Sequence, residues 1–359
     1  MSKQPPKIFG TLLKEVVQSD LCTFCGACMA ACPVNVIIPT DEEKPTIKGM
    51  CVLCQMCYYS CPRVKLPIDD VETRVFGRTR SLNESDLGIV RASYVGRSSN
   101  GQILNVAQDG GVVTSLLAHA LETGLVNCAV GATKSVETPW KPTPTLIESR
   151  DQLLASAGTK VTTSGSLNGV ADAWVGHPES KLAFVGLPCQ IQALRRILTS
   201  PQGPHKYGES VILAIGLFCN NSYRYGKLVL DYLKAQKNLD LQTITKMRLD
   251  AAGDSYKVYK GGKTVVESSG KEIEPYVLGA CSKCNDFTSE LADISVGANG
   301  APDGWCTLLV RTEIGEKLVA SAIEKNVIET KPLAEGLSIV REISLKKKKR
   351  EAPYISHAN

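Results

Sequence analysis

Residues 22–33 read CTFCGACMAACP, and residues 51–62 read CVLCQMCYYSCP. The four cysteines and the proline of the first stretch recur in the second at a constant offset of 29 residues. The spacing C-x2-C-x2-C-x3-C-P, present twice, is typical of bacterial iron–sulfur proteins with two [4Fe–4S] clusters. We therefore predict a small ferredoxin-type module over residues 21–66.

The same spacing assigns the cluster ligands. Three closely spaced thiolates bind one cluster, and the fourth cysteine of each run binds the other cluster. The first cluster would take Cys22, Cys25, Cys28 and Cys61. The second cluster would take Cys51, Cys54, Cys57 and Cys32. Zinc also suits thiolates, but two complete copies with trailing prolines favour iron–sulfur. Such a pair of clusters conducts electrons, so another part of the chain must supply or receive them.

Composition restricts the compartment and the partners. The 359 residues are 43% hydrophobic and 21% charged, which is ordinary for a soluble globular protein. The formal charge of +5 becomes near neutral or slightly acidic with two or three clusters of roughly −2 each, so no nucleic-acid partner is expected. Fourteen cysteines without a signal peptide indicate the reducing cytoplasm. No apolar run is long enough for a transmembrane segment, so any peripheral membrane contact would go through a partner complex.

The chain divides into five parts by composition and pattern. From residue 92 onward, strands and helices alternate, which predicts an α/β or α+β domain with a mixed sheet. The polar stretch before it is interpreted as a linker, although it could wrap the next domain. The basic run Lys346–Arg350 is interpreted as part of a solvated tail, with docking on an acidic partner or an anionic membrane as the alternative. The predicted parts are an N-terminal segment (1–20), the ferredoxin module (21–66), the linker (67–91), the larger domain (92–340) and the basic tail (341–359).

Six cysteines lie outside the repeat: Cys128, Cys189, Cys219, Cys281, Cys284 and Cys306. Cys281 and Cys284 have the spacing of metal ligands, which suits zinc, iron–sulfur or a redox dithiol equally. Cys189 and Cys219 each follow a predicted strand, where α/β domains build their sites. Four of the six could bind a third cluster, or all could be buried free cysteines. Cys128, in an apolar strand, fits the buried alternative best.

Common nucleotide motifs are missing. No G-x-G-x-x-G follows a strand, and the stretch Gly203–Ser210 has Glu209 where a phosphate-binding loop requires lysine. The four histidines show no ligand or triad grouping. The sequence therefore supports neither a hydrolase nor a conventional NAD site, and it identifies no catalytic side chain.

Six stretches between about Ala92 and Asn326 form a characteristic series: Gln108–Leu117, Ser156–Lys160, Gly186–Ile191, Gly216–Cys219, Cys281–Phe287 and Ala292–Gly297. In these stretches and their order the chain resembles the beta-subunit family of coenzyme F420 hydrogenases and dehydrogenases. The ferredoxin module in front is similar to that of F-type subunits of F420H2 dehydrogenases, which act as electron-input modules.

The resemblance implies a bound FAD and a third [4Fe–4S] cluster. The ligands of that cluster would be Cys189, Cys219, Cys281 and Cys284. Cys306 departs from the family pattern, which commonly has Ser or Thr there, and adds a thiol near the expected site. The residues expected at the flavin are Gly110, Gly111, Thr114, Ser115, Ser156, Lys160, Gly186 and Gln190. A glycine pair at a helix N-terminus lets backbone N–H groups approach phosphate, although an ordinary tight turn would explain the pair as well.

The implied activity is hydride exchange between coenzyme F420 and the flavin. Electrons would then leave singly through the third cluster and the ferredoxin clusters to ferredoxin or a larger redox complex, and the flow could equally reverse. Two other functions stay open, because a fold does not define a substrate. One is a ferredoxin-dependent reductase of another organic substrate, and the other is a non-enzymatic electron-transfer adaptor.

Overall fold

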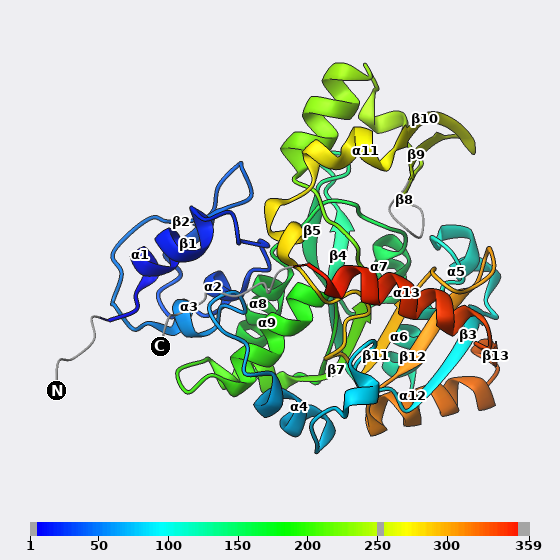
Figure 1. Ribbon diagram of the computed structural model, residues 1–359, viewed down its shortest axis with the longest axis horizontal. Helices are drawn as coiled ribbons and strands as arrows, with labels where there is room; N and C mark the ends of the chain where they lie inside the picture. The colour runs from blue at the N-terminus through cyan, green and yellow to red at the C-terminus, as the bar shows by residue number, and fades with distance from the viewer. Residues whose placement is uncertain (1–5, 250–254, 351–359) are drawn as a thin grey trace.

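The computed structural model describes residues 6–249 and 255–350. The ferredoxin-type module lies at one end of the molecule, in blue in Figure 1. It consists of short helices, an antiparallel hairpin and the two cysteine loops. Its elements are α1 (Phe9–Leu12), α2 (Ala27–Ala30), β1 (Ile37–Pro39), β2 (Pro45–Ile47) and α3 (Met56–Tyr59).

The larger domain is built on an eight-stranded mixed sheet. Its four central strands are mutually parallel, and the outer strands on both sides run antiparallel to their neighbours. The order across the sheet is β13-β3-β12-β11-β7-β6-β4-β5. The strands are β3 (Ala92–Ser98), β4 (Cys128–Lys134), β5 (Pro142–Ile147), β6 (Leu182–Gly186), β7 (Val211–Leu217), β11 (Ile294–Gly297), β12 (Cys306–Val310) and β13 (Ile328–Pro332). The mixed sheet predicted from the alternation of strands and helices is confirmed.

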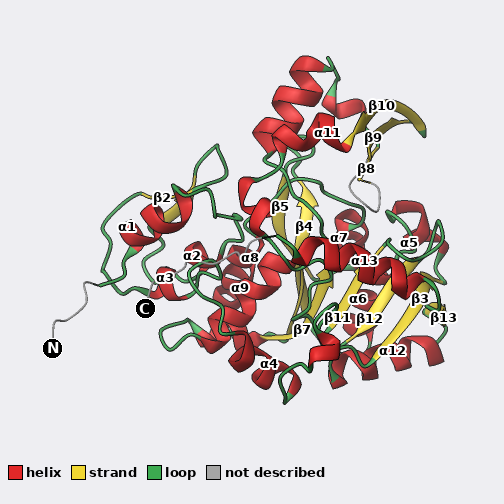
Figure 2. Ribbon diagram, in the orientation of Figure 1, coloured by secondary structure: helices red, strands yellow, loops and turns green. Residues whose placement is uncertain are grey.

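Helices cover both faces of this sheet (Figure 2). The central strands read as almost continuous apolar runs, such as VILAIGL in β7, because strands buried on both faces need apolar side chains throughout. Alternate residues of β6 enter two different cores: Ala183 packs toward one face, and Leu182 and Phe184 toward the other. The first core includes α6 (Val112–Glu122), α7 (Arg150–Ser156) and α12 (Glu313–Glu324). The second core includes α8 (Ser166–Gly176) and α9 (Pro188–Thr199).

A smaller unit stands above the sheet in Figure 1. It contains a helix at Gly226–Gln236 and a separate three-stranded antiparallel sheet with its own aromatic core. Gly261 and Gly262, at φ +54° and +80°, make the turn of an antiparallel hairpin in this sheet. The remaining elements of the unit are β8 (Lys246–Leu249), β9 (Ser255–Lys260), β10 (Lys263–Ser269) and α11 (Gly270–Ile273).

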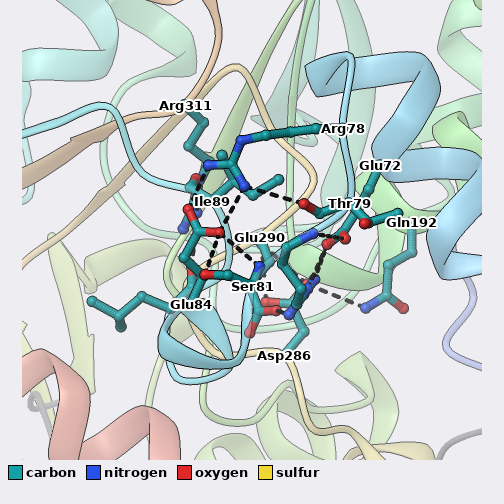
Figure 3. Close-up of polar contacts among 12 residues, drawn as sticks. Glu72, Arg78, Thr79, Ser81, Glu84, Ile89, Gln192, Asp286, Glu290 and Arg311 are labelled. Carbon is teal, nitrogen blue, oxygen red and sulfur yellow. Dashed lines mark hydrogen bonds and ion pairs between the residues drawn. The ribbon is translucent and has the colours of Figure 1, made fainter.

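Residues 67–91, expected as a linker, form a folded strap. Helix α4 (Ile68–Phe76) packs against α9, with Val71 fully buried in the second core. After the helix, Arg80 forms ion pairs of 2.5 Å with both Glu72 and Glu290. Figure 3 labels the two glutamates. Some of the polar residues that suggest a solvated linker therefore form buried contacts with one another and with the larger domain.

The basic run near the C-terminus is also part of the fold. Helix α13 (Gly336–Lys348), red in Figure 1, lies along the larger domain and includes most of this run. Lys347 is only 2% exposed, so the expectation of a solvated tail is wrong for residues 341–350. Residues 351–359 of the predicted tail lie outside the described residues. Among the described helices, none has the length and apolarity to cross a bilayer.

Candidate functional site

The ferredoxin-type module contains two small cavities lined by cysteines. One, of about 30 Å³, is lined by Cys22, Cys25, Cys28 and Cys61. The other, of about 10 Å³, is lined by Cys32, Cys51, Cys54 and Cys57. Each cavity thus combines three cysteines of one copy with the fourth cysteine of the other copy, as the spacing predicts. Left-handed residues before α2 and α3 allow the sharp turns: Gly26 has φ +94° and Gln55 has φ +68°.

Four further cysteines from distant parts of the chain meet near the sheet. Cys189 lies in the first turn of α9, Cys219 follows β7, and the other two lie at a helical turn over residues 279–283. Burial and the neighbouring thiols Cys281 and Cys284 raise the pKa of Cys219 to about 12, against the opposing charge of Lys347. Burial likewise raises the pKa of Cys189 well above its ordinary value, with Cys284 and Cys219 adding to the rise. The four residues expected to bind a third cluster are therefore mutual neighbours.

This donor set fits a thiolate-bound cluster. Four soft sulfur ligands are available, of which Cys281 and Cys284 are buried. The backbone N–H of Ser222 points at the sulfur of Cys281 at 3.3 Å. Burial raises the pKa of Cys284, but the charges of Lys347 and Arg63 lower it, and the net direction is down. The surroundings thus favour thiolates over thiols at this position.

Across residues 6–249 and 255–350, no three His, Cys, Asp or Glu side chains are close enough to hold one metal ion.

A much larger cavity, of about 340 Å³, opens at the carboxyl ends of the central strands. Its volume falls in the range of about 300–1,000 Å³ that is usual for ligand sites, and strand ends are where open α/β sheets bind ligands. Gly186, Leu217 and Gly297, which end β6, β7 and β11, all line it. Cys219 lines it too, so the cavity borders the third set of cysteines.

Most residues expected at a flavin line this cavity. They are Gly111, Thr114, Ser156, Lys160, Gly186 and Gln190. Two expected residues do not. A Cβ on Gly110 would lie 2.7 Å from the carbonyl oxygen of Gly96, so this glycine allows close packing against β3. Ser115 is fully buried, and its hydroxyl donates to Ser98 Oγ at 2.7 Å. Neither residue lines the cavity, and their place at a flavin stays a prediction.

Lys160 organises one wall of the cavity. Its ammonium donates to the carbonyl oxygens of Ser156, Ala157 and Gly158. Burial, together with the charge of Lys134, lowers its pKa from 10.5 to about 7. The lysine therefore shapes the loop that carries it and places a titratable cation at the cavity wall.

Gln190, which also lines the cavity, has a structural role. Its side-chain nitrogen donates to Ser164 O at 2.8 Å and to Ser166 Oγ at 3.1 Å. Its side-chain oxygen accepts from the backbone N–H of Leu187 at 2.8 Å, which caps α9. The amide thus fixes the turn at the end of β6.

Cys306 and Cys128 are separate from the three cysteine sets. Cys306 lines the large cavity, and burial raises its pKa to about 11, against the backbone N–H groups of Gly110 and Val112. It therefore lies at the N-terminus of α6. Cys128 is 2% exposed in the second core, where it packs as a small apolar residue.

Sequence reasoning missed the basic residues around the third set of cysteines. Arg63, 1% exposed, follows the last cysteine of the repeat, and burial-driven rises in the pKa of Cys189 and Cys281 are opposed by its charge. The equivalent residue of the other copy is Val34. This difference between the two copies is the one sequence feature that could have pointed to Arg63. Lys347 and Arg350 gave no such signal, because a lysine-rich C-terminal run is usually solvated.

An α/β sheet with a ligand cavity at its strand ends, next to buried cysteines and joined to a cysteine-rich module, defines an iron–sulfur redox protein. The [4Fe–4S] binding domain family matches residues 15–38, which confirms the iron–sulfur assignment of the module. The chain belongs to the coenzyme F420 hydrogenase/dehydrogenase beta-subunit family. The N-terminal part of that family matches residues 93–170, and its C-terminal part matches residues 179–336.

Relatives agree with this placement. The beta subunit of the coenzyme F420 hydrogenase of Methanothermobacter thermautotrophicus is 34% identical over 74% of this chain and 93% of its own. The F-type subunit of the F420H2 dehydrogenase of Methanosarcina mazei is 30% identical over 98% of this chain and 94% of its own. A chain of the F420-reducing [NiFe] hydrogenase complex from Methanosarcina barkeri is similar in structure. Its TM-score is 0.69 at 30% identity, over 74% of this chain and 91% of that one.

Proposed function

We propose that this chain exchanges hydride with coenzyme F420 at an FAD in the large cavity and exchanges single electrons with a redox partner through three [4Fe–4S] clusters. The observation that carries the proposal is the contact between sites: Cys219 belongs to the third set of cysteines and also lines the cavity. FAD, when bound, would supply the conversion between two-electron hydride transfer and one-electron transfer.

Residues of the cavity wall would bind and orient the flavin. Gly111 and Thr114 stand at the start of α6, and the N-terminus of a helix favours phosphate. The loop at Ser156–Lys160 adds a hydroxyl and a cation at the same cavity. Val185 and Leu217 contribute apolar surface that excludes water from the reacting rings.

The cysteine sets suit a route from the cavity to the surface. Arg63 lines the first module cavity, and its charge also acts on the thiol of Cys189. Cys54, in the other module cavity, is exposed, which makes that end the natural contact for an electron partner. Relatives are subunits of hydrogenase and dehydrogenase complexes, and we infer a larger redox complex here too. Fourteen cysteines suit the reducing cytoplasm, with any membrane contact made by a partner.

The test is an anaerobic measurement of iron, flavin and spectrum on the purified protein, followed by addition of reduced F420 or NADH. We expect about 12 iron per chain from three clusters, one FAD, and rapid bleaching of the flavin by reduced F420 only. A flavin that reduced F420 does not bleach would overturn the proposed substrate and favour a reductase of another organic compound. About 8 iron without flavin would favour the electron-transfer adaptor.

A further inference from the structure

The last turn of α13 contacts both segments that follow β7 and β10 and carry cysteines of the third set. The ammonium of Lys347 donates to the carbonyl oxygen of Cys219 at 2.6 Å and to that of Asp286 at 2.9 Å. The side chain is 2% exposed, and lysine is almost never buried to this degree without a compensating partner. Lys347 therefore joins two segments that are distant in the sequence.

Arg350 reinforces the same junction. Its guanidinium donates to the carbonyl oxygen of Cys281 at 2.8 Å and to that of Asn220 at 3.1 Å. A further bond of 3.0 Å reaches the side-chain oxygen of Asn220. Two cations from one helix end thus hold the backbone beside Cys219 and Cys281.

The charge of Lys347 has few other partners. In the described part of the chain, Lys348 pairs with Glu290 at 2.5 Å, whereas Lys347 makes no ion pair with a carboxylate. The groups that face it are the thiols of Cys219, Cys281 and Cys284, together with the guanidinium of Arg350. The carboxyl group of Asp286 also senses its charge. The sulfur atoms of these three cysteines are therefore the groups on which its charge acts most.

We propose that Lys347 is a positioning residue for the third cluster, whose buried charge stabilises the reduced cluster and whose two hydrogen bonds fix the cysteine-bearing segments. This inference rests on the proposed function, because it requires a cluster at Cys189, Cys219, Cys281 and Cys284. One-electron reduction adds one negative charge to such a cluster and makes or breaks no bond. A fixed positive charge in a low-dielectric site favours that extra charge, and net charge is one of the factors that set cluster potentials.

The test is a redox titration of the full holoprotein with dithionite, followed by electron paramagnetic resonance. The signal that changes in a Cys189→Ser variant identifies the third cluster. In Lys347→Gln, we expect the ratio of reduced to oxidised third cluster, at the wild-type midpoint, to fall about tenfold. That change corresponds to about 59 mV for a one-electron couple. The signals of the two module clusters should not shift.

Two variants separate charge from packing. Lys347→Arg keeps the charge and should restore most of the potential, which a purely structural contact would not require. Lys346→Gln removes the same charge from the neighbouring exposed position and should leave the titration unchanged. An unchanged potential in Lys347→Gln, or an equal shift in Lys346→Gln, would overturn the inference.

Lys347→Gln could lose the third cluster altogether, and iron content distinguishes this outcome. If Lys347→Gln holds only about 8 iron, the same redox titration is done on Arg350→Gln, which removes the partly buried second cation. An unshifted potential of the third cluster in that variant overturns the inference. About 8 iron in the wild-type protein would instead remove the third cluster and the proposed function with it. About 12 iron with an unshifted variant would overturn the role of Lys347 alone.

Discussion

The two copies of the cysteine repeat have the same spacing and very different surroundings. In the first copy, Cys25 packs against the second core of the larger domain, and its carbonyl oxygen accepts from the N–H of Leu167 at 3.1 Å. The equivalent residue of the second copy, Cys54, is exposed, and its neighbours Val52 and Leu53 are each 54% exposed. Ligand spacing is thus shared, while the residues between the ligands decide which copy faces the domain and which faces solvent.

A single position illustrates the difference most strongly. Gly26 and Gln55 occupy equivalent places in the repeat, and both have positive φ, at +94° and +68°. A Cβ on Gly26 would lie 2.5 Å from the carbonyl oxygen of Gly165 and 2.9 Å from the nitrogen of Asn168. Gln55 instead has room for a long side chain, which accepts from the N–H of Lys7 at 2.8 Å. Close approach to the larger domain is therefore possible only for the copy with glycine.

The largest predicted effect follows from this pair. Gly26→Ala should destabilise the docked module by roughly 2–4 kcal/mol, because backbone strain adds to a clash with backbone atoms. Gln55→Ala, the matched control, should cost only about 1 kcal/mol for one lost hydrogen bond. Thermal unfolding followed by cluster absorbance measures both. Equal losses in the two variants would show that the copies are not held differently.

The second prediction uses the residue after each Cys-Pro pair. Arg63 is 1% exposed and Val34 is 42% exposed. Arg63 lines the first module cavity and opposes the burial-driven rise in the pKa of Cys189, so its charge lies between two predicted clusters. Arg63→Gln should lower the reduced-to-oxidised ratio of both clusters by about tenfold at their wild-type midpoints, which is about 59 mV for a one-electron couple.

Its control is Val34→Gln, which adds the same side chain at the exposed equivalent position and should shift no potential. Redox titrations of both variants provide the measurement. A shift confined to the third cluster in Arg63→Gln would place the charge nearer that site than the module. No shift in either cluster would contradict the bridging position of Arg63.

The sequence predicted those features that depend on local spacing. The cysteine spacing is sufficient to group the cysteines that line each module cavity, because the loop between them is short. The alternation of apolar runs is sufficient for a mixed sheet. The sequence could not determine which side of α6 faces the cavity: Thr114 lines it, whereas the adjacent Ser115 is buried against Ser98.

The features it missed depend on contacts between distant residues. Arg80 pairs with Glu290, 210 residues away, and Lys347 binds the carbonyl of Cys219, 128 residues away. Each residue looks solvated in its local stretch, because runs of charge usually are. Only the folded chain brings their partners together, which is why the strap and the end of α13 were interpreted as a linker and a tail.

The smallest predicted effect concerns the hairpin that connects the two copies. Glu43 is 3% exposed, and its carboxylate accepts from the N–H of Tyr225 at 2.7 Å, which joins the module to the larger domain. Burial raises its pKa from 4.5 to about 7, against the opposing effects of Tyr225 and Arg224. The folded state therefore binds this proton more tightly than the unfolded state, and stability falls as pH rises from about 4.5 to about 7.

Between pH 6 and pH 8 the loss of stability should be about 1 kcal/mol. Glu43→Gln should remove this dependence and leave the protein more stable at pH 8, as thermal unfolding across the range would show. Glu42→Gln, its exposed neighbour, should keep the wild-type slope. A slope that survives in Glu43→Gln would mean that another group controls how the module docks.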